Sequence, residues 1–321
     1  MRIVLVECDH DSFVPERELA AESGIDFEIR LSSGIDELVE HAQGADGILM
    51  QYAQLTGEVL DQIPGLKAVG RYGVGVDTVD IDAASARGIA VCNVPDYGSE
   101  SVSDHAIALA LSVARGVTRL DRSVRRGSAD IEFAKPMHEI SSGRVFGIIG
   151  AGLIGRAAAR KARGLGFRTI GYDVMAVAGT TVDGVEMLGF DEVLRTADVV
   201  SLHVPLGPDT LHLIDGEALA GVKPGTILVN TSRGGVVDTD AVVDALTSGR
   251  LGGAGLDVFE TEPLPLGHPL LDIDSAVLTP HVAWYTEESY ARLKRRTLEN
   301  VIEVCEGRTP RNILNPSVLG S

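Results

Sequence analysis

The chain has 321 residues, of which 45% are hydrophobic and 23% are charged, a globular composition with room for two domains. Its formal net charge of −18 argues against nucleic acid or an anionic membrane as a partner, because both require clustered Lys and Arg. Cys8, Cys92 and Cys305 form no CxxC motif or metal-binding spacing, so we expect a reducing compartment. The N-terminal apolar run is too short for a signal peptide, and no segment approaches the length of a transmembrane helix, so we expect a cytoplasmic protein.

Apolar runs alternate with helix-like stretches up to about residue 98, a pattern typical of a parallel α/β sheet. The expected strands lie at 3–6, 27–30, 47–50, 68–71 and 90–92, and the expected helices at 16–23, 35–42, 57–62 and 81–87. This part of the chain therefore predicts one small doubly wound domain.

The stretch from 99 to 126 is rich in Ala and Leu with helical periodicity, and it predicts one long helix with Ser99 near its N-cap. A polar, irregular connection is expected at 127–143. Later expected elements are strands at 199–203, 226–230, 253–257 and 276–279 and an amphipathic helix at 287–306.

A glycine motif interrupts an apolar run at residues 145–155, which read Val-Phe-Gly-Ile-Ile-Gly-Ala-Gly-Leu-Ile-Gly. The three motif glycines have separate functions. Gly150 permits a tight turn, Gly152 lets the backbone approach a pyrophosphate, and Gly155 allows a helix to pack closely on the strand. The pattern predicts a strand, a phosphate-binding turn and a helix.

The start of that helix, at Leu153 and Ile154, offers free N–H groups to an anion. A second apolar run, 169–173, ends at Asp173. This carboxylate can accept hydrogen bonds from the adenosine ribose, and its charge would repel a 2′-phosphate. We therefore expect the cofactor to be NAD(H) rather than NADP(H).

Four further segments lie at or after expected strand ends, where ligands bind in open α/β sheets. They are residues 202–205, 230–235, 255–263 and 279–284. Together they supply Arg233, Glu262 and His281, the set that the reduction of a 2-oxo acid requires.

Each of these residue types has a chemical reason to be there. Arg233 can bind a substrate carboxylate in a bidentate fork. His281 can protonate the alkoxide that hydride addition leaves, and Glu262 can support the imidazolium form. Taken singly, the three could be a surface ion pair, a structural histidine and a loop charge. Their joint occurrence after a dinucleotide motif favours catalysis.

These motifs resemble the D-isomer-specific 2-hydroxyacid dehydrogenases over nearly the whole chain. The resemblance is carried by residues 73–77, 150–155, 230–234, 255–263 and 279–283. Within the family, residues 91–97 and 281–285 look most like the C-terminal-binding-protein branch, which includes NAD-sensing transcriptional corepressors and bacterial enzymes.

The resemblance implies a role for each candidate. Arg233 would hold the carboxylate and carbonyl oxygen of the substrate, and His281 would be the acid in reduction and the base in oxidation. Glu262 would orient and charge His281. The backbone N–H groups of Val74 and Gly75 would bind the substrate carboxylate.

The resemblance also implies cofactor contacts. Asp257 and Thr231 would hold the nicotinamide carboxamide. The other implied cofactor-binding residues are His203, Val204 and Pro205 on the adenosine side, Thr210 near a phosphate, Ser232 and Ala283.

For the fold, the resemblance implies two doubly wound parallel-sheet domains with a cleft between them. A flavodoxin-like substrate-binding domain would comprise residues 1–99 plus 288–321. A Rossmann NAD-binding domain would comprise residues 100–287. The family usually dimerises through its nucleotide-binding domains, so a homodimer is expected.

The substrate side chain is expected to face aromatic residues, which suit a neutral or apolar group better than a phosphate. Tyr52 and Trp284 are the main candidates, with Tyr72, Tyr97 and Tyr285 beside them, although each could instead be part of a core. An unphosphorylated 2-oxo acid is therefore favoured.

Two classes of function remain. The first is an NAD-dependent 2-hydroxyacid dehydrogenase that works mainly as a 2-oxo acid reductase. The second is an NAD(H)-sensing, corepressor-like binding protein with vestigial activity. The intact set of Arg233, Glu262 and His281, together with the lack of a basic patch, favours the enzyme. Formate and phosphonate dehydrogenation are narrower alternatives, and Glu262 argues against formate because the formate enzymes lack this glutamate.

Overall fold

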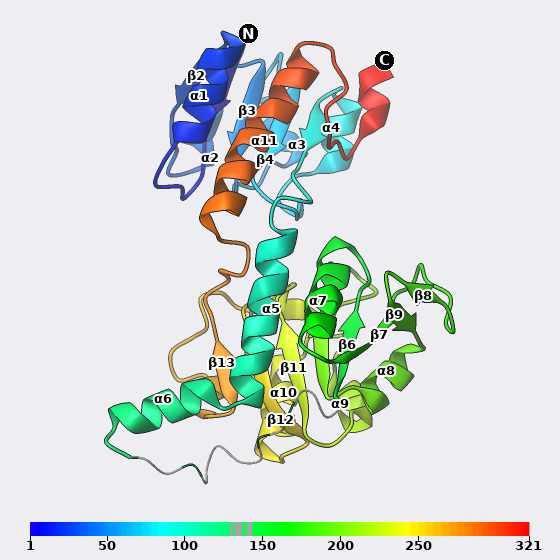
Figure 1. Cartoon of the computed structure of the whole chain (residues 1–321). Helices are drawn as coiled ribbons and strands as arrows, with labels where there is room; N and C mark the ends of the chain where they lie inside the picture. The colour runs from blue at the N-terminus through cyan, green and yellow to red at the C-terminus, as the bar shows by residue number, and fades with distance from the viewer. Residues whose placement is uncertain (129–130, 132–136, 138, 140–142, 321) are drawn as a thin grey trace. The chain divides into compact units, whose positions relative to one another are not determined.

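The computed structural model describes residues 1–128, 131, 137, 139 and 143–320. The chain forms two compact units (Figure 1). Unit 1 comprises Met1–Gly98 and Thr286–Ser321, and unit 2 comprises Ser99–Tyr285. Each contains a largely parallel sheet covered by helices, so the predicted α/β class is confirmed. None of the described helices has the length and apolar character needed to span a bilayer.

Unit 1 contains a five-stranded parallel sheet in the order β2-β1-β3-β4-β5, the flavodoxin-like order. Its strands are β1 (Arg2–Leu5), β2 (Asp26–Ile29), β3 (Gly47–Met50), β4 (Ala68–Arg71) and β5 (Ala90–Cys92). Its helices are α1 (Val14–Ser23), α2 (Ile35–Ala42), α3 (Gly57–Asp61), α4 (Ile81–Ala86), α11 (Glu287–Cys305) and the 3-10 helix η5 (Pro316–Gly320).

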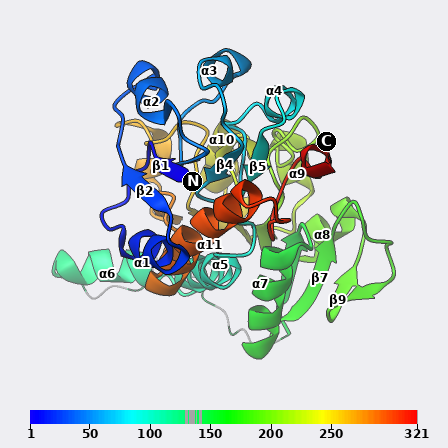
Figure 2. The same cartoon turned by 90° about the horizontal axis from the view of Figure 1, so that it is seen from above.

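Helices cover both faces of this sheet (Figure 2). Side chains from α2, α3 and α4, such as Leu38 and Leu60, pack into one core with Val4, Ile48 and Val69 of the strands. Helix α11 contacts β3, β4 and β5, and α1 packs beside it. Strands β3, β4 and β5 are buried on both sides, which explains their apolar sequences, whereas β2 at the edge is partly exposed and alternates polar and apolar residues.

Unit 2 contains an eight-stranded sheet in the order β13-β12-β11-β10-β6-β7-β9-β8. All of its neighbouring strands pair in parallel except the edge hairpin of β8 and β9. The strands are β6 (Val145–Ile149), β7 (Arg168–Tyr172), β8 (Thr181–Val182), β9 (Val185–Met187), β10 (Val199–Leu202), β11 (Thr226–Asn230), β12 (Leu251–Leu256) and β13 (Ala276–Leu278). The order from β9 to β12 is that of a Rossmann fold.

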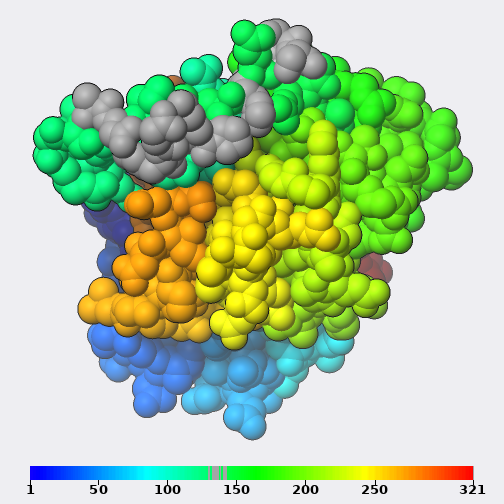
Figure 3. Space-filling model, turned by 90° about the horizontal axis from the view of Figure 1, so that it is seen from below, coloured from blue at the N-terminus to red at the C-terminus, as the bar shows by residue number. Residues whose placement is uncertain are grey.

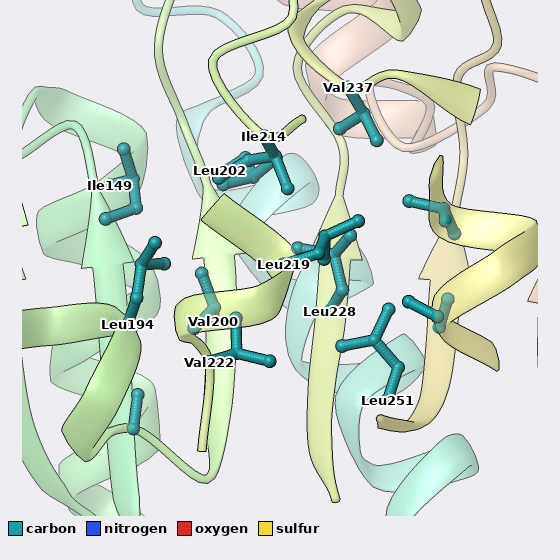
Figure 4. Close-up of a cluster of buried hydrophobic side chains, with 14 of the residues drawn as sticks. Ile149, Leu194, Val200, Leu202, Ile214, Leu219, Val222, Leu228, Val237 and Leu251 are labelled. Carbon is teal, nitrogen blue, oxygen red and sulfur yellow. The ribbon is translucent and has the colours of Figure 1, made fainter. Parts of the chain in front are cut away.

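The described helices of unit 2 lie on both faces of the sheet. They are α5 (Ser99–Ala114), α6 (Val117–Arg125), α7 (Leu153–Gly164), α8 (Phe190–Thr196), α9 (Gly216–Gly221), α10 (Thr239–Thr247), η3 (Gly234–Val236) and η4 (Pro269–Asp272). Helices α8, α9 and α10 cover a core that includes Ile149, Leu194 and Leu228 (Figure 4). Helices α5 and α7 cover the other face. On one surface, the chain around α10 and β12 (yellow) lies beside the chain leading to β13 (orange) (Figure 3).

Two details differ from the sequence predictions. The single helix expected at 99–126 is two helices, because Gly116 adopts a left-handed conformation with φ of 59° and ends the regular helix there. The hairpin of β8 and β9 was not anticipated, since its strands are only two and three residues long. Most of the connection expected at 127–143 lies outside the described residues.

Candidate active site

The glycine turn follows β6. Gly150 has φ of 97°, and a Cβ there would lie 2.7 Å from the carbonyl oxygen of His203. A Cβ on Gly155 would lie 2.0 Å from the carbonyl oxygen of Gly150, so α7 packs directly on the turn. Gly152 precedes α7 and faces open space, while Leu153 is half exposed. The turn therefore presents an open backbone and a helix N-terminus, which suits an anionic ligand.

Asp173 follows β7 and ties this strand to the turn. Its Oδ2 accepts a hydrogen bond from the N–H of Ala151 at 2.7 Å, and its Oδ1 accepts one from the N–H of Met175 at 2.8 Å. The carboxylate is only partly buried. It can therefore take a further hydroxyl donor, as a ribose would supply.

The loop after β10 carries His203, whose Nε2 lies 2.9 Å from the hydroxyl of Ser201. Burial lowers the pKa of His203 to about 4, so this ring is neutral at pH 7. Further along, Thr210 Oγ1 donates to the carbonyl of Pro205 at 2.6 Å and accepts from the N–H of Gly207 at 2.8 Å. These bonds close the loop on itself. Val204, which is expected on the adenosine side of the cofactor, packs partly into the core of unit 2.

Asn230 shapes the turn after β11, a function that the sequence analysis missed. It is 1% exposed, its Oδ1 accepts from the N–H and hydroxyl of Ser232, and its Nδ2 donates to the carbonyl of Arg233 at 2.9 Å. Between them, Thr231 Oγ1 is buried and has no hydrogen-bond partner within the described part of the chain. A buried hydroxyl of this kind fits a ligand amide as its partner.

Two loops meet at Gly234, where a Cβ would lie 1.9 Å from the backbone of Phe259. The N–H of Phe259 in turn donates to Glu262 Oε1 at 2.9 Å. Burial raises the pKa of Glu262, but the hydrogen bonds from His281 and Phe259 and the charges of His281 and Arg233 outweigh it and leave the pKa lowered. The two loops thus place Glu262 against His281, with the charge of Arg233 acting on the carboxylate.

His281 is held by both its ring and its backbone. Its Nδ1 lies 2.7 Å from Glu262 Oε2, which leaves Nε2 for another partner. Its N–H donates to the carbonyls of Asp257 at 2.7 Å and Thr279 at 3.1 Å. Its φ is 54°, a strained conformation for a residue with a side chain. Such strain persists only where the surroundings fix the loop.

Asp257 provides that support. It is 1% exposed, and its Oδ1 accepts from Thr279 Oγ1 at 2.5 Å and from the N–H of Val282 at 3.0 Å. Its Oδ2 accepts from the N–H of Ala283 at 2.8 Å. The family resemblance implies that Asp257 holds the cofactor. In the structure, Asp257 also holds the 279–283 loop through these hydrogen bonds.

In unit 1, Val74 and Gly75 lie in the loop after β4. Gly73 has φ of 132°, and the carbonyl of Val74 accepts a hydrogen bond from Asn93 Nδ2 at 2.7 Å. Val74 is 40% exposed. The loop therefore has a fixed backbone and an open surface.

The aromatic residues divide into two groups. Tyr72 and Tyr97 are 1% and 6% exposed, so they belong to the core of unit 1, and the expectation that they line a pocket is wrong. Tyr52 and Tyr285 are 52% and 41% exposed. The ring of Trp284 packs edge-to-face on Tyr285, with 5.5 Å between centroids.

Comparison with known proteins identifies the family. Residues 107–283 match the family described as "D-isomer specific 2-hydroxyacid dehydrogenase, NAD binding domain". A glyoxylate reductase of Korarchaeum cryptofilum (strain OPF8) is 38% identical over 318 residues, which cover 95% of both chains. The chain belongs to the D-isomer-specific 2-hydroxyacid dehydrogenase family.

Two further members show how far the similarity extends. A glycerate dehydrogenase of Methylorubrum extorquens is 36% identical over 87% of this chain and 88% of its own length. The crystal structure of TT0316 protein from Thermus thermophilus has a TM-score of 0.88 and 36% identity, covering 98% of this chain and 100% of its own.

The expected activity and cofactor are confirmed: the chain is an NAD-binding D-2-hydroxyacid dehydrogenase. The two relatives above that carry an enzyme name are a glyoxylate reductase and a glycerate dehydrogenase. They do not support the expected closer resemblance to the C-terminal-binding-protein branch.

Proposed function

We propose that this dehydrogenase reduces a small, unphosphorylated 2-oxo acid, of the size of glyoxylate or hydroxypyruvate, to the D-2-hydroxy acid. The 2.7 Å contact between His281 and Glu262, close to the charge of Arg233, carries the proposal. The names of these two relatives, glyoxylate reductase and glycerate dehydrogenase, fit a small substrate. Other relatives of similar identity are named D-3-phosphoglycerate dehydrogenase, so the unphosphorylated class rests on the loop after β3 and not on the names.

In the proposed mechanism, the Glu262 carboxylate accepts the Nδ1–H of His281 and fixes the ring. The opposite nitrogen, Nε2, then carries the proton that is transferred. Arg233 binds the substrate carboxylate and polarises the carbonyl. When bound at the glycine turn, NADH would supply the hydride for the carbonyl carbon. The carbonyl π electrons move to the oxygen, which takes the Nε2 proton and becomes the hydroxyl.

For the cofactor, we propose that Gly150, Gly152 and Gly155 form the pyrophosphate turn and that Asp173 binds the adenosine ribose. The unpartnered hydroxyl of Thr231 supports a contact with the nicotinamide carboxamide. The other proposed cofactor contacts are Leu153, Ile154, His203, Val204, Pro205, Thr210, Ser232, Asp257 and Ala283.

For the substrate, we propose that the N–H groups of Val74 and Gly75 bind its carboxylate and that Tyr52 and Trp284 face its side chain. The loop after β3 supports an unphosphorylated substrate. Residues 51–54 contain no Lys or Arg, and three successive N–H groups, from 51 to 53, donate to Glu7 Oε2. Glu7 therefore occupies N–H groups that a phosphate would otherwise use, and the cation whose charge acts on Tyr52 is Arg71, at the end of β4.

We further propose that unit 1 is the substrate-binding domain and unit 2 the NAD-binding domain, which contains the family match at 107–283. A homodimer through unit 2 is supported by α6, where Val117 and Val124, seven residues apart, are 54% and 67% exposed. Light scattering on wild type and on the Val117→Glu/Val124→Glu variant tests this. A monomeric wild type contradicts it.

The experiment for the activity measures the loss of NADH absorbance with glyoxylate, hydroxypyruvate, pyruvate, 3-phosphohydroxypyruvate and a branched-chain oxo acid. We expect turnover of a small, unphosphorylated member and slower turnover of the phosphorylated one. Preference for the phosphate would overturn the substrate class. No turnover with NADH tightly bound would favour the NAD(H)-sensing alternative.

A further inference from the structure

One histidine that the proposed mechanism does not use contacts the loop of His281. His105 lies on α5, one quarter of its side chain is exposed, and its Nε2 is 2.9 Å from Thr279 Oγ1. The same nitrogen is 3.5 Å from Asp257 Oδ1. All of these residues belong to unit 2.

The hydrogen bonds define which atom carries the hydrogen. Thr279 has one hydroxyl hydrogen, and it donates this hydrogen to Asp257 Oδ1 at 2.5 Å. The hydroxyl oxygen can therefore only accept from His105, so Nε2 of His105 must carry a hydrogen. His105 thus holds the hydroxyl in the orientation that serves Asp257.

The packing of α5 on β12 brings the groups together. A Cβ on Gly253 would lie 2.4 Å from Val113 Cγ1, and a Cβ on Gly255 would lie 2.7 Å from Leu109 Cβ. His105, Leu109 and Val113 are four residues apart and share one helix face. The two glycines alternate along the strand, and the aspartate of the network comes two residues later. The glycines therefore admit the helix and place its histidine at the strand end.

We propose that His105 is a positioning residue for His281. Its N–H orients the hydroxyl of Thr279, and this hydroxyl helps to hold the Asp257 carboxylate. Asp257 in turn holds the N–H groups of Val282 and Ala283 and, through its own carbonyl, the N–H of His281. The effect on turnover rests on the proposed role of His281. The effect on the loop does not.

Two substitutions separate this role from simple packing. His105→Leu keeps the bulk of the side chain and removes the donor, whereas His105→Gln keeps an N–H donor at the position of Nε2. His268→Leu is the matched control. It removes a partly buried histidine of the same unit, whose ring accepts from the N–H of Leu270.

We expect His105→Leu to lower kcat about tenfold to a hundredfold, since a small displacement of a catalytic group costs this much. NADH affinity is expected to fall less than kcat, because the network includes only Asp257 and Ala283 among the proposed cofactor contacts and leaves the glycine turn after β6 intact. His105→Gln should recover most of kcat, and His268→Leu should keep it. Wild-type kcat in His105→Leu, or a Gln variant no better than Leu, would overturn the proposal.

Hydrogen exchange provides a readout that needs no turnover. The N–H groups of residues 281–283 are all bound by Asp257, so their exchange should be faster in His105→Leu than in wild type, His105→Gln and His268→Leu. Unchanged exchange at 281–283 would refute the positioning role. If wild type turns over no oxo acid, the proposed function fails, and the exchange rates still decide this inference.

Discussion

Asp173 and Asp257 each follow a parallel strand of the same sheet, and each accepts backbone N–H groups from a loop beside it. They differ in exposure. Asp257 is 1% exposed and receives three protein donors, whereas Asp173 is partly exposed and receives two. A buried carboxylate that receives three protein donors mainly builds a loop, and a half-open one that receives two retains more acceptor capacity for a ligand.

This difference cannot be read from the residue type or from its place at a strand end, which are the same in both cases. The covering element decides it. Helix α5 covers the end of β12 and supplies His105, whereas the residues after Asp173, Val174 and Met175, are 81% and 90% exposed. Substitutions in the two regions should therefore have different effects.

The substitution with the largest expected effect, His281→Ala, tests whether the 279–283 loop that Asp257 supports carries the proton donor. His281→Ala should lower kcat by about 10²- to 10⁴-fold, the usual contribution of a general acid, while NADH binding stays close to wild type. Steady-state kinetics and fluorescence titration of NADH measure both quantities. His268→Ala is the control, and near wild-type kcat in His281→Ala would place the donor elsewhere.

The next prediction concerns Asp257, the residue that holds the 279–283 loop. Asp257→Asn keeps the size of the side chain but turns an NH2 group toward an N–H donor, either at Ala283 or at Val282. We expect the free energy of unfolding to fall by about 1–3 kcal/mol and kcat to fall with it.

Denaturant titration and kinetics check this result. Asp215→Asn is the control, because Asp215 accepts one N–H at the N-terminus of α9, far along the chain from the 279–283 loop. It should cost less stability and leave kcat unchanged. A stable Asp257→Asn variant with full activity would show that the buried carboxylate is dispensable.

On the other side of the comparison, Asp173→Ala should affect cofactor choice more than turnover. Removing the charge should reduce the preference for NADH over NADPH about tenfold, or about 1.4 kcal/mol, with kcat on NADH largely kept. The ratio of kcat/KM for the two cofactors measures this. Glu186→Ala removes an equal charge from an exposed position on the neighbouring strand β9 and should leave the ratio unchanged. An unchanged ratio in Asp173→Ala would disprove its discriminating role.

Much of the fold could be predicted because strands buried on both faces appear in the sequence as continuous apolar runs, as in 47–50 and 226–230. The helix break at Gly116 could not, because a glycine inside an apolar-periodic stretch is compatible with either a helix or its end. The β8–β9 hairpin was missed for a different reason: its strands are too short for a periodic signal.

For the site, motif spacing predicted Arg233, Glu262 and His281, and the structure places Glu262 against His281, with the charge of Arg233 acting on the Glu262 carboxylate. The supporting residues were not found. Asn230 and His105 act through hydrogen bonds to a turn and to a distant loop, and no local sequence pattern records such contacts. The sequence did contain a signal for His105. On α5, His105, Leu109 and Val113 are spaced four residues apart, and β12 carries Gly253 and Gly255 at alternate positions. This pattern can be interpreted only when it is known that α5 packs on β12.

The smallest expected effect concerns His203, whose carbonyl and ring lie against Gly150 and Gly155 in the cofactor turn. Its folded pKa of about 4 is below the ordinary value of 6.5, so between these values the unfolded chain binds more protons. The stability due to neutral His203 is therefore complete above pH 6.5 and declines as the pH falls toward 4.

His203→Gln, which keeps a polar group near Ser201, should lose less stability over this range than wild type. Each 1 kcal/mol corresponds to about 2–4 °C in Tm, so scans at pH 7.5 and pH 5 should resolve the difference. His268→Gln controls for the loss of a histidine, and equal Tm changes in wild type and His203→Gln would show that the ring takes up its proton as readily in the folded chain.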